Sequence, residues 1–81
     1  MSVEAEVDRI VALIREAGGI GPVGPDEDFY EAGFASAKAL NLLLELEAVF
    51  GLSVPDDRFV ESRTPRAIAS MIAGLEQDAR V

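Results

Sequence analysis

The sequence predicts an all-α fold, a small four-helix bundle with three long helices, one short helix and a long first loop. Hydrophobic residues recur at three- and four-residue spacing in three stretches of the chain. Glycine ends two of these stretches, and a helix-capping threonine begins the third. Strand signals are absent apart from the short run 52–54. The 81 residues are 49% hydrophobic, which suffices for one compact core, so we expect a single domain spanning 1–81.

The first helix is predicted over residues 2–17. Ser2 is a candidate N-cap, and Glu4 lies in the first turn, where the helix dipole favours an acidic side chain. Gly18 and Gly19 are expected to end the helix, because glycine adopts the left-handed cap conformation without steric cost. The apolar stripe that would face the core consists of Val3, Val7, Ile10, Val11, Ile14 and Ala17.

Residues 18–35 are predicted to form the long loop. They hold most of the glycine and half of the proline of the chain, so they cannot form one regular helix. A loop of this length packs through its own side chains or carries function. We expect a short helical turn within "DEDFYEAG", and the expected anchors are Ile20, Val23, Phe29 and Phe34.

Residues 36–50 give the strongest helix signal, with Ser36 at the start and Gly51 as the stop. Leu40 and Leu44 lie beside the inward stripe, either as further core residues or as an exposed binding face. The inward stripe consists of Ala39, Leu42, Leu43, Leu46, Val49 and Phe50, and the opposite side carries Lys38, Asn41 and Glu45.

The remaining helices follow Pro55. Asp56 or Asp57 is expected to cap a short helix that reaches Glu61, with Phe59 and Val60 turned inward. The last helix is predicted to start with Thr64 as N-cap and Pro65 at the first helical position. Its inward residues are Ile68, Met71, Ile72 and Leu75.

The composition excludes several classes of function. With 15 acidic and 7 basic residues, the net charge is −8, which disfavours nucleic acid and anionic membranes and favours basic protein surfaces. Without cysteine or histidine, the chain lacks thiolate metal sites and the usual base near neutral pH. Neither a signal peptide nor a membrane-spanning run is visible, so we expect a cytoplasmic protein.

Two functional motifs, an EF-hand loop and a serine hydrolase site, do not match the sequence. Glu31 and Ala37 stand where an EF-hand loop starting at Asp26 would need glycine and glutamate, so no metal site is expected. A serine hydrolase needs a base beside its nucleophile, and "GFASA" lacks the nucleophile-elbow pattern around Ser36. We therefore expect that the chain is not an enzyme.

Ser36 admits two interpretations from its position alone. Serine is a favoured N-cap, which stabilises a helix by about 1 kcal/mol. A phosphate ester on the same hydroxyl would lie at the positive end of a helix, and the small neighbours Ala35 and Ala37 would leave a modifying enzyme room.

Residues 28–72 contain a series of residues at fixed spacing around Ser36. Phe29 and Gly33 precede the serine, and the later members are Leu42, Leu46-Glu47, Phe50-Gly51, Pro55, Thr64, Ile68 and Ile72. The ordered combination resembles the acyl and peptidyl carrier protein family, whose first motif Phe29, Gly33 and Ser36 match in register. The resemblance implies that a transferase moves 4′-phosphopantetheine from coenzyme A to Ser36, and that the thiol of this arm holds cargo as a thioester.

The chain departs from the family pattern around the serine. The family's Asp-Ser-Leu is Ala35-Ser36-Ala37 here, and Ala32 replaces a leucine. The family's aspartate helps the transferase and its leucine often contacts partners, so both departures put ordinary modification and ordinary partners in doubt. By resemblance, the residues expected to contact partners are Phe34, Ala35, Ala37, Lys38, Leu40, Asn41, Leu44 and Glu45.

The resemblance leaves the cargo open among fatty or polyketide acyl groups, amino acids or peptides, and specialised sugar-linked or lipid intermediates. The less acidic helix face and the unusual serine neighbours favour an amino acid, as in stand-alone carriers loaded by ligases that resemble aminoacyl-tRNA synthetases. The implied partners are a phosphopantetheinyl transferase, a loading ligase and acceptor enzymes, with the carrier a monomer. The alternative is a carrier-like interaction module without an arm.

Overall fold

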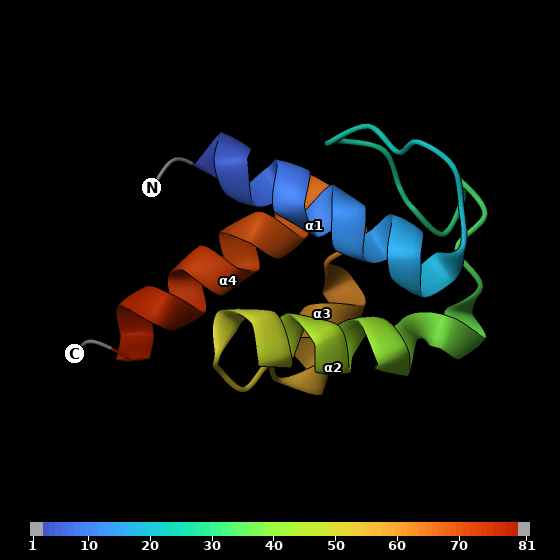
Figure 1. Ribbon diagram of the computed structural model, residues 1–81. Helices are drawn as coiled ribbons and strands as arrows, with labels where there is room; N and C mark the ends of the chain where they lie inside the picture. The colour runs from blue at the N-terminus through green and yellow to red at the C-terminus, as the bar shows by residue number, and fades with distance from the viewer. Residues whose placement is uncertain (1–2, 80–81) are drawn as a thin grey trace.

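The computed structural model describes residues 3–79 and shows a small helical bundle (Figure 1). The described residues form three long helices and one short helix, as predicted, and contain no strand. No helix in this part of the chain has both the length and the hydrophobicity that a membrane span requires. The elements are α1 (Val3–Gly18), the 3-10 turn η1 (Ser36–Lys38), α2 (Ala39–Phe50), α3 (Asp56–Glu61) and α4 (Pro65–Ala79).

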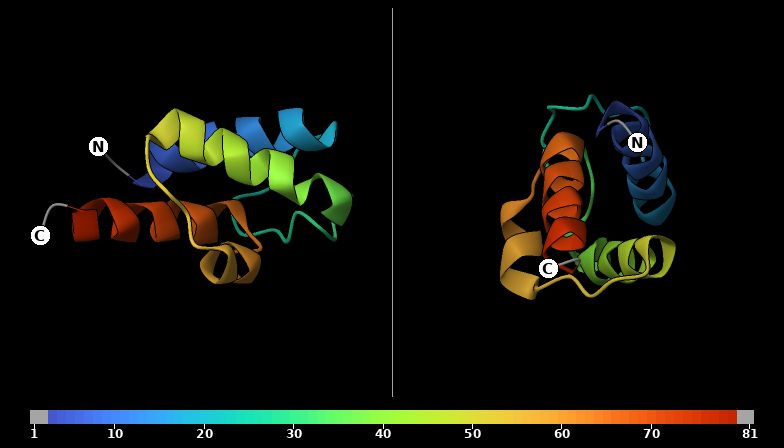
Figure 2. Two further views of the ribbon diagram at one scale, coloured as in Figure 1. Left: turned by 90° about the horizontal axis from the view of Figure 1, so that it is seen from below. Right: turned by 90° about the vertical axis from the view of Figure 1, so that its left-hand side faces the viewer.

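Helix α1 is the centre of the packing. It runs antiparallel to α2 and also packs against α4, and α3 packs against α4 (Figures 1 and 2). The long loop lies at the end of the bundle opposite the start of α1 and the end of α4, close to the start of α2 (Figure 1). The buried core consists of Val7, Ile10, Ile14, Val23, Phe29, Phe34, Leu42, Leu43, Leu46, Val54, Phe59, Ile68, Ala69, Met71 and Ile72.

The end of α1 agrees with the glycine signal. Gly19 has a φ of 63°, and its amide donates a hydrogen bond of 2.8 Å to the carbonyl oxygen of Arg15. This is a left-handed cap, which glycine forms without the strain that a Cβ would cause. The predicted N-cap Ser2 and the side chain of Glu4 lie outside the described residues.

The long loop is fastened to the start of α4. The Phe29 amide donates to the Arg63 carbonyl oxygen at 3.1 Å, and the Arg66 amide donates to the Pro25 carbonyl oxygen at 2.9 Å. Val23 and Phe29 are buried as expected, whereas Ile20 is only half-buried. The segment expected to contain a helical turn forms hydrogen-bonded turns without a helix.

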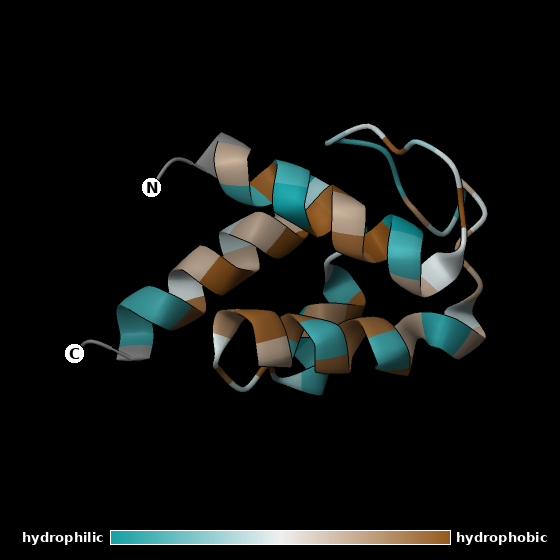
Figure 3. Ribbon diagram, in the orientation of Figure 1, coloured by the Kyte–Doolittle hydropathy of each residue, from teal (hydrophilic) through white to brown (hydrophobic). Residues whose placement is uncertain are grey.

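Helix α2 begins later than predicted, because residues 36–38 form a 3-10 turn. Leu42, Leu43 and Leu46 are buried, while Ala39, Val49 and Phe50 are half-buried. Leu40 and Leu44 are 62% and 54% exposed, so they do not belong to the core. Hydrophobic and hydrophilic residues alternate along the visible face of α2 (Figure 3).

The two later helices follow the prediction in part. Phe59 is buried, but Val60 is 65% exposed, so the expectation that both face inward is wrong for Val60. Pro55 occupies the N-cap position of α3, and Asp56 and Asp57 lie in its first turn instead of capping it.

The predicted cap of α4 is confirmed. The Thr64 hydroxyl oxygen accepts a hydrogen bond of 3.0 Å from the Ala67 amide, and the helix starts at Pro65.

Candidate functional site

Ser36 is the first residue of η1 and is exposed to solvent. The N-cap position belongs to Ala35, whose backbone is extended with φ −71° and ψ 128°, and no side chain caps this turn. The interpretation of Ser36 as an N-cap is therefore wrong. A capping residue must lie outside the helical turn, and Ser36 lies inside it.

The Ser36 hydroxyl is open to an approaching molecule. Within residues 3–79, no side chain or backbone group forms a hydrogen bond with it. Its neighbours Ala35 and Ala37 are also exposed and carry only methyl groups. A serine without a structural task, flanked by small residues, is suited to covalent modification.

Aromatic packing against the core fixes the backbone that leads to Ser36. Phe34 is 2% exposed, and its ring meets those of Phe29 and Tyr30 edge-on, with centroid distances of 5.4 and 5.7 Å. Gly33, with a φ of 115°, makes the turn that a larger residue would adopt only with strain. The buried ring and the turn at Gly33 therefore hold this part of the loop, and with it Ser36, in a fixed position.

The burial of Phe34 corrects one predicted partner contact. A ring that is 2% exposed cannot contact a partner directly, so Phe34 acts as an anchor of the loop. This agrees with the other prediction made for the same residue, that it packs the loop onto the core.

The other predicted partner contacts are exposed and share one surface along η1 and α2. Lys38 extends back to the end of α1, where its Nζ donates to the Gly18 carbonyl oxygen at 3.4 Å. These exposed residues are Ala35, Ala37, Lys38, Leu40, Asn41, Leu44 and Glu45.

A charged contact fixes the loop on the side of α4. Arg63 Nε donates to Asp28 Oδ2 at 2.7 Å, and the guanidinium lies 4.7 Å from the centroid of the Tyr30 ring. The hydrogen bond from Arg63 lowers the pKa of Asp28, and the backbone amides of Glu31 and Tyr30 add to this effect. Burial of the Tyr30 ring raises the pKa of its hydroxyl.

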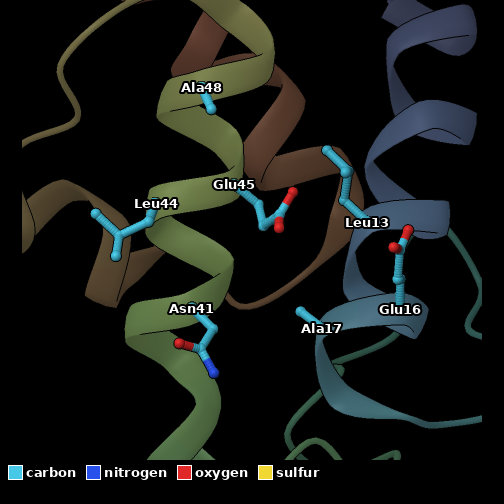
Figure 4. Close-up of a pocket in the computed structure, with 7 residues that line it drawn as sticks. All are labelled: Leu13, Glu16, Ala17, Asn41, Leu44, Glu45 and Ala48. Carbon is cyan, nitrogen blue, oxygen red and sulfur yellow. The ribbon is translucent and has the colours of Figure 1, made fainter.

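A groove between α1 and α2 was not predicted from the sequence. Its volume is about 490 Å³, and it opens beside the exposed face of α2 (Figure 4). Hydrophobic spacing identifies the residues that face the core but not the surface side chains that two neighbouring helices bring together. The groove is lined by Leu13, Glu16 and Ala17 of α1 and by Asn41, Leu44, Glu45 and Ala48 of α2.

A helical bundle that presents an exposed serine at the start of its second long helix, in a chain without histidine, has the organisation of a carrier domain. The family model described as "Phosphopantetheine attachment site" matches residues 8–72, and the chain belongs to this family. Its cofactor is covalently attached 4′-phosphopantetheine. The chain is therefore a carrier protein of the acyl carrier type and not an enzyme.

A solved structure supports this assignment. The acetyl form of the actinorhodin acyl carrier protein from Streptomyces coelicolor superposes with a TM-score of 0.64 at 27% identity. The match covers 98% of this chain and 94% of the actinorhodin protein. A search of curated proteins finds no significant match. Carriers of this type interact with phosphopantetheinyl transferases and with partner enzymes.

Proposed function

We propose that Ser36 carries the 4′-phosphopantetheine arm and that the protein presents an acyl or aminoacyl group to partner enzymes. The observation that carries this proposal is the exposed Ser36 hydroxyl, which forms no hydrogen bond within the described residues. Its place at the first turn before α2 supports the same role, because unpaired backbone amides at a helix start favour a phosphate.

In the attachment step, Ser36 Oγ attacks the phosphorus atom of coenzyme A that bears the pantetheine. A new oxygen–phosphorus bond forms, and the pyrophosphate bond breaks to release adenosine 3′,5′-bisphosphate. The transferase accepts the hydroxyl proton, because no side chain of the described residues forms a hydrogen bond with Ser36 Oγ. The protein's own contribution is an open hydroxyl at a fixed position.

When bound, the arm supplies a thiol that holds cargo as a thioester. The chain has no cysteine, so no side chain of the protein competes with that thiol. The fastened loop and the anchored Phe34 keep the attachment point at one place on the surface.

The preferred cargo is an amino acid. Among the predicted partner contacts of η1 and α2, Glu45 is the acidic residue, whereas Lys38 is basic and Asn41 is uncharged. Ala35 and Ala37 flank the serine. These features set the chain apart from the acidic-faced carriers of fatty acid synthesis. A small acyl group is the second candidate, favoured by the similarity to a carrier whose solved form is acetylated.

The proposal includes a loading ligase, acceptor enzymes and a monomeric carrier, with residues 1–81 as one domain. It places the reaction in the cytoplasm, where coenzyme A is available to the transferase. The net charge of −8 supports partners with basic surfaces.

Intact mass spectrometry after incubation with coenzyme A and a broad-specificity phosphopantetheinyl transferase tests the attachment. We expect the wild type and the Ser70→Ala control, which alters an exposed serine of α4, to gain the mass of one arm. The Ser36→Ala variant should gain none. A wild type that stays unmodified while a control carrier is modified would favour the interaction module without an arm.

Loading of the armed protein separates the cargo classes. Aminoacyl and acyl groups would be attached synthetically to the thiol of the arm. The two loaded proteins would then be compared as substrates of candidate acceptor enzymes. Preferential transfer of the aminoacyl group supports the preferred cargo, and preferential transfer of the acyl group supports the second candidate.

A further inference from the structure

The groove between α1 and α2 has apolar side chains on its α1 side and polar side chains on its α2 side. Leu13 and Ala17 lean from α1 towards α2, while Asn41 and Glu45 lean from α2 towards α1 (Figure 4). Leu44 lies at the outer edge and points away from α1 (Figure 4). The groove can therefore accept an apolar side chain from outside, next to two carboxylates.

The two carboxylates of the groove are available to a partner. Glu16 and Glu45 are exposed, and neither forms an ion pair with another described residue. Lys38 of η1 donates to the Gly18 carbonyl oxygen at the end of α1. No basic residue lines the groove. The complementary surface is an apolar side chain flanked by lysine or arginine.

The position of the groove relates it to Ser36. Ala37, Asn41, Glu45 and Ala48 recur at helical spacing along η1 and α2, so one exposed stripe leads from the serine into the groove. An enzyme that reaches Ser36 from solvent meets this stripe. Coenzyme A carries several phosphate groups, so a transferase that binds it presents lysine and arginine close to its active site.

We propose that the α1–α2 groove is a docking site for the phosphopantetheinyl transferase, which inserts an apolar side chain between Glu16 and Glu45. The proposal rests on the proposed attachment at Ser36. It adds helix α1 to the partner surface, through Leu13, Glu16 and Ala17. It also supplies acidic contacts in a chain that has Ala35 beside its serine.

Steady-state kinetics of arm attachment test the docking site with charge variants. Glu16→Lys alters the groove, and Asp8→Lys alters an exposed acid of α1 that does not line it. Both substitutions raise the net charge by two units, so long-range effects on association are matched. We expect Glu16→Lys to raise KM for the carrier by roughly five- to tenfold relative to Asp8→Lys, with little change in kcat.

A second pair of variants tests the shape of the groove without a charge change. Ala48→Phe fills the groove, whereas Ala73→Phe adds the same ring to an exposed position of α4. We expect only Ala48→Phe to raise KM. Circular dichroism of all four variants verifies the helical fold before the kinetics are compared.

The outcomes separate the two proposals. Equal KM values within each pair, with the wild type still modified at Ser36, would overturn the docking site and leave the proposed function intact. A wild type that gains no arm would overturn the proposed function and the docking site together. A KM increase confined to Glu16→Lys and Ala48→Phe would support both.

Discussion

At the scale of single residues, Gly18 and Phe34 show how closely the serine loop is fitted to α1. A Cβ added at Gly18 would lie 2.5 Å from the Phe34 ring, which is buried and packed against two other rings. Glycine in a helix normally costs about 1 kcal/mol relative to alanine. Here the missing methyl group makes room for the loop anchor.

We predict that Gly18→Ala destabilises the protein by about 1–2 kcal/mol, because overpacking outweighs the gain in helix propensity. Gly74→Ala is the matched control in α4, where an added Cβ would lie 3.5 Å from the Arg58 side chain, an ordinary contact. This control should stabilise the fold by up to about 1 kcal/mol. Urea denaturation measures both, and a stabilised Gly18→Ala variant would show that the ring moves aside easily.

Ala35 departs from the family pattern, and we expect this departure to affect arm attachment. It is exposed and directly precedes Ser36, where the family's aspartate helps the transferase. We predict that Ala35→Asp raises kcat/KM for arm attachment by roughly tenfold, since a carboxylate there can form a charged contact with a basic enzyme. Ala35→Asn is the matched control without the charge. Equal rates for the wild type and Ala35→Asp would mean that this chain has no need of the acid.

At the scale of elements, the helices predicted from the sequence were those whose signals are local. Thr64 followed by proline predicted the start of α4, and the structure confirms the cap. The expectations of Ser36 as an N-cap, Phe34 as a partner contact and Val60 as an inward residue failed because they depend on the surroundings. The loop places Ala35 at the cap position, and the core takes up Phe34 while no neighbouring helix covers Val60.

Leu40 and Leu44 illustrate the same limit. Periodicity showed that they lie beside the inward stripe but not how far the neighbouring elements extend around α2. The structure leaves both exposed, so they do not extend the core. The groove contribution of Leu13 and Glu16 could not be predicted, because helical spacing within α1 does not reveal which helix lies beside it.

We predict that Thr64→Ala destabilises the protein by about 1 kcal/mol, because the Ala67 amide loses its acceptor. Thr64→Ser should retain most of the stability, since its hydroxyl can accept the same hydrogen bond. Urea denaturation of the three proteins measures the difference. Equal losses in both variants would assign the effect to the threonine methyl group instead of the cap.

At the scale of the whole molecule, charge acts in two opposing ways. The net charge of −8 makes the compact state repel itself, and acidification relieves this repulsion. The Asp28–Arg63 and Asp26–Arg66 pairs, by contrast, bind the loop that positions Ser36 to the start of α4. As the pH falls, the change in the free energy of unfolding therefore depends on whether the repulsion or the ion pairs are lost first.

The Asp28–Arg63 pair allows the two effects to be separated. The pKa of Asp28 is lowered below its ordinary value of 3.8, mainly because Arg63 donates a hydrogen bond to it. A carboxyl whose pKa is lowered by folding stabilises the protein above its unfolded pKa, and this stabilisation is lost as the pH falls through the folded pKa. Asp28→Asn removes the charge but keeps an oxygen that can accept from the Tyr30 amide.

We therefore predict that the wild type is more stable than Asp28→Asn at pH 7, and that the difference shrinks as the pH falls below about 4. Relief of the overall repulsion affects both proteins to a similar extent, since their net charges at pH 7 are −8 and −7. Urea denaturation between pH 7 and pH 2.5 measures the difference. In an Arg63→Gln background, Asp28→Asn should have a smaller effect at pH 7. A difference that stays constant with pH would mean that the charge of this pair does not hold the loop, and that the backbone hydrogen bonds and the aromatic packing of Phe34 position the serine.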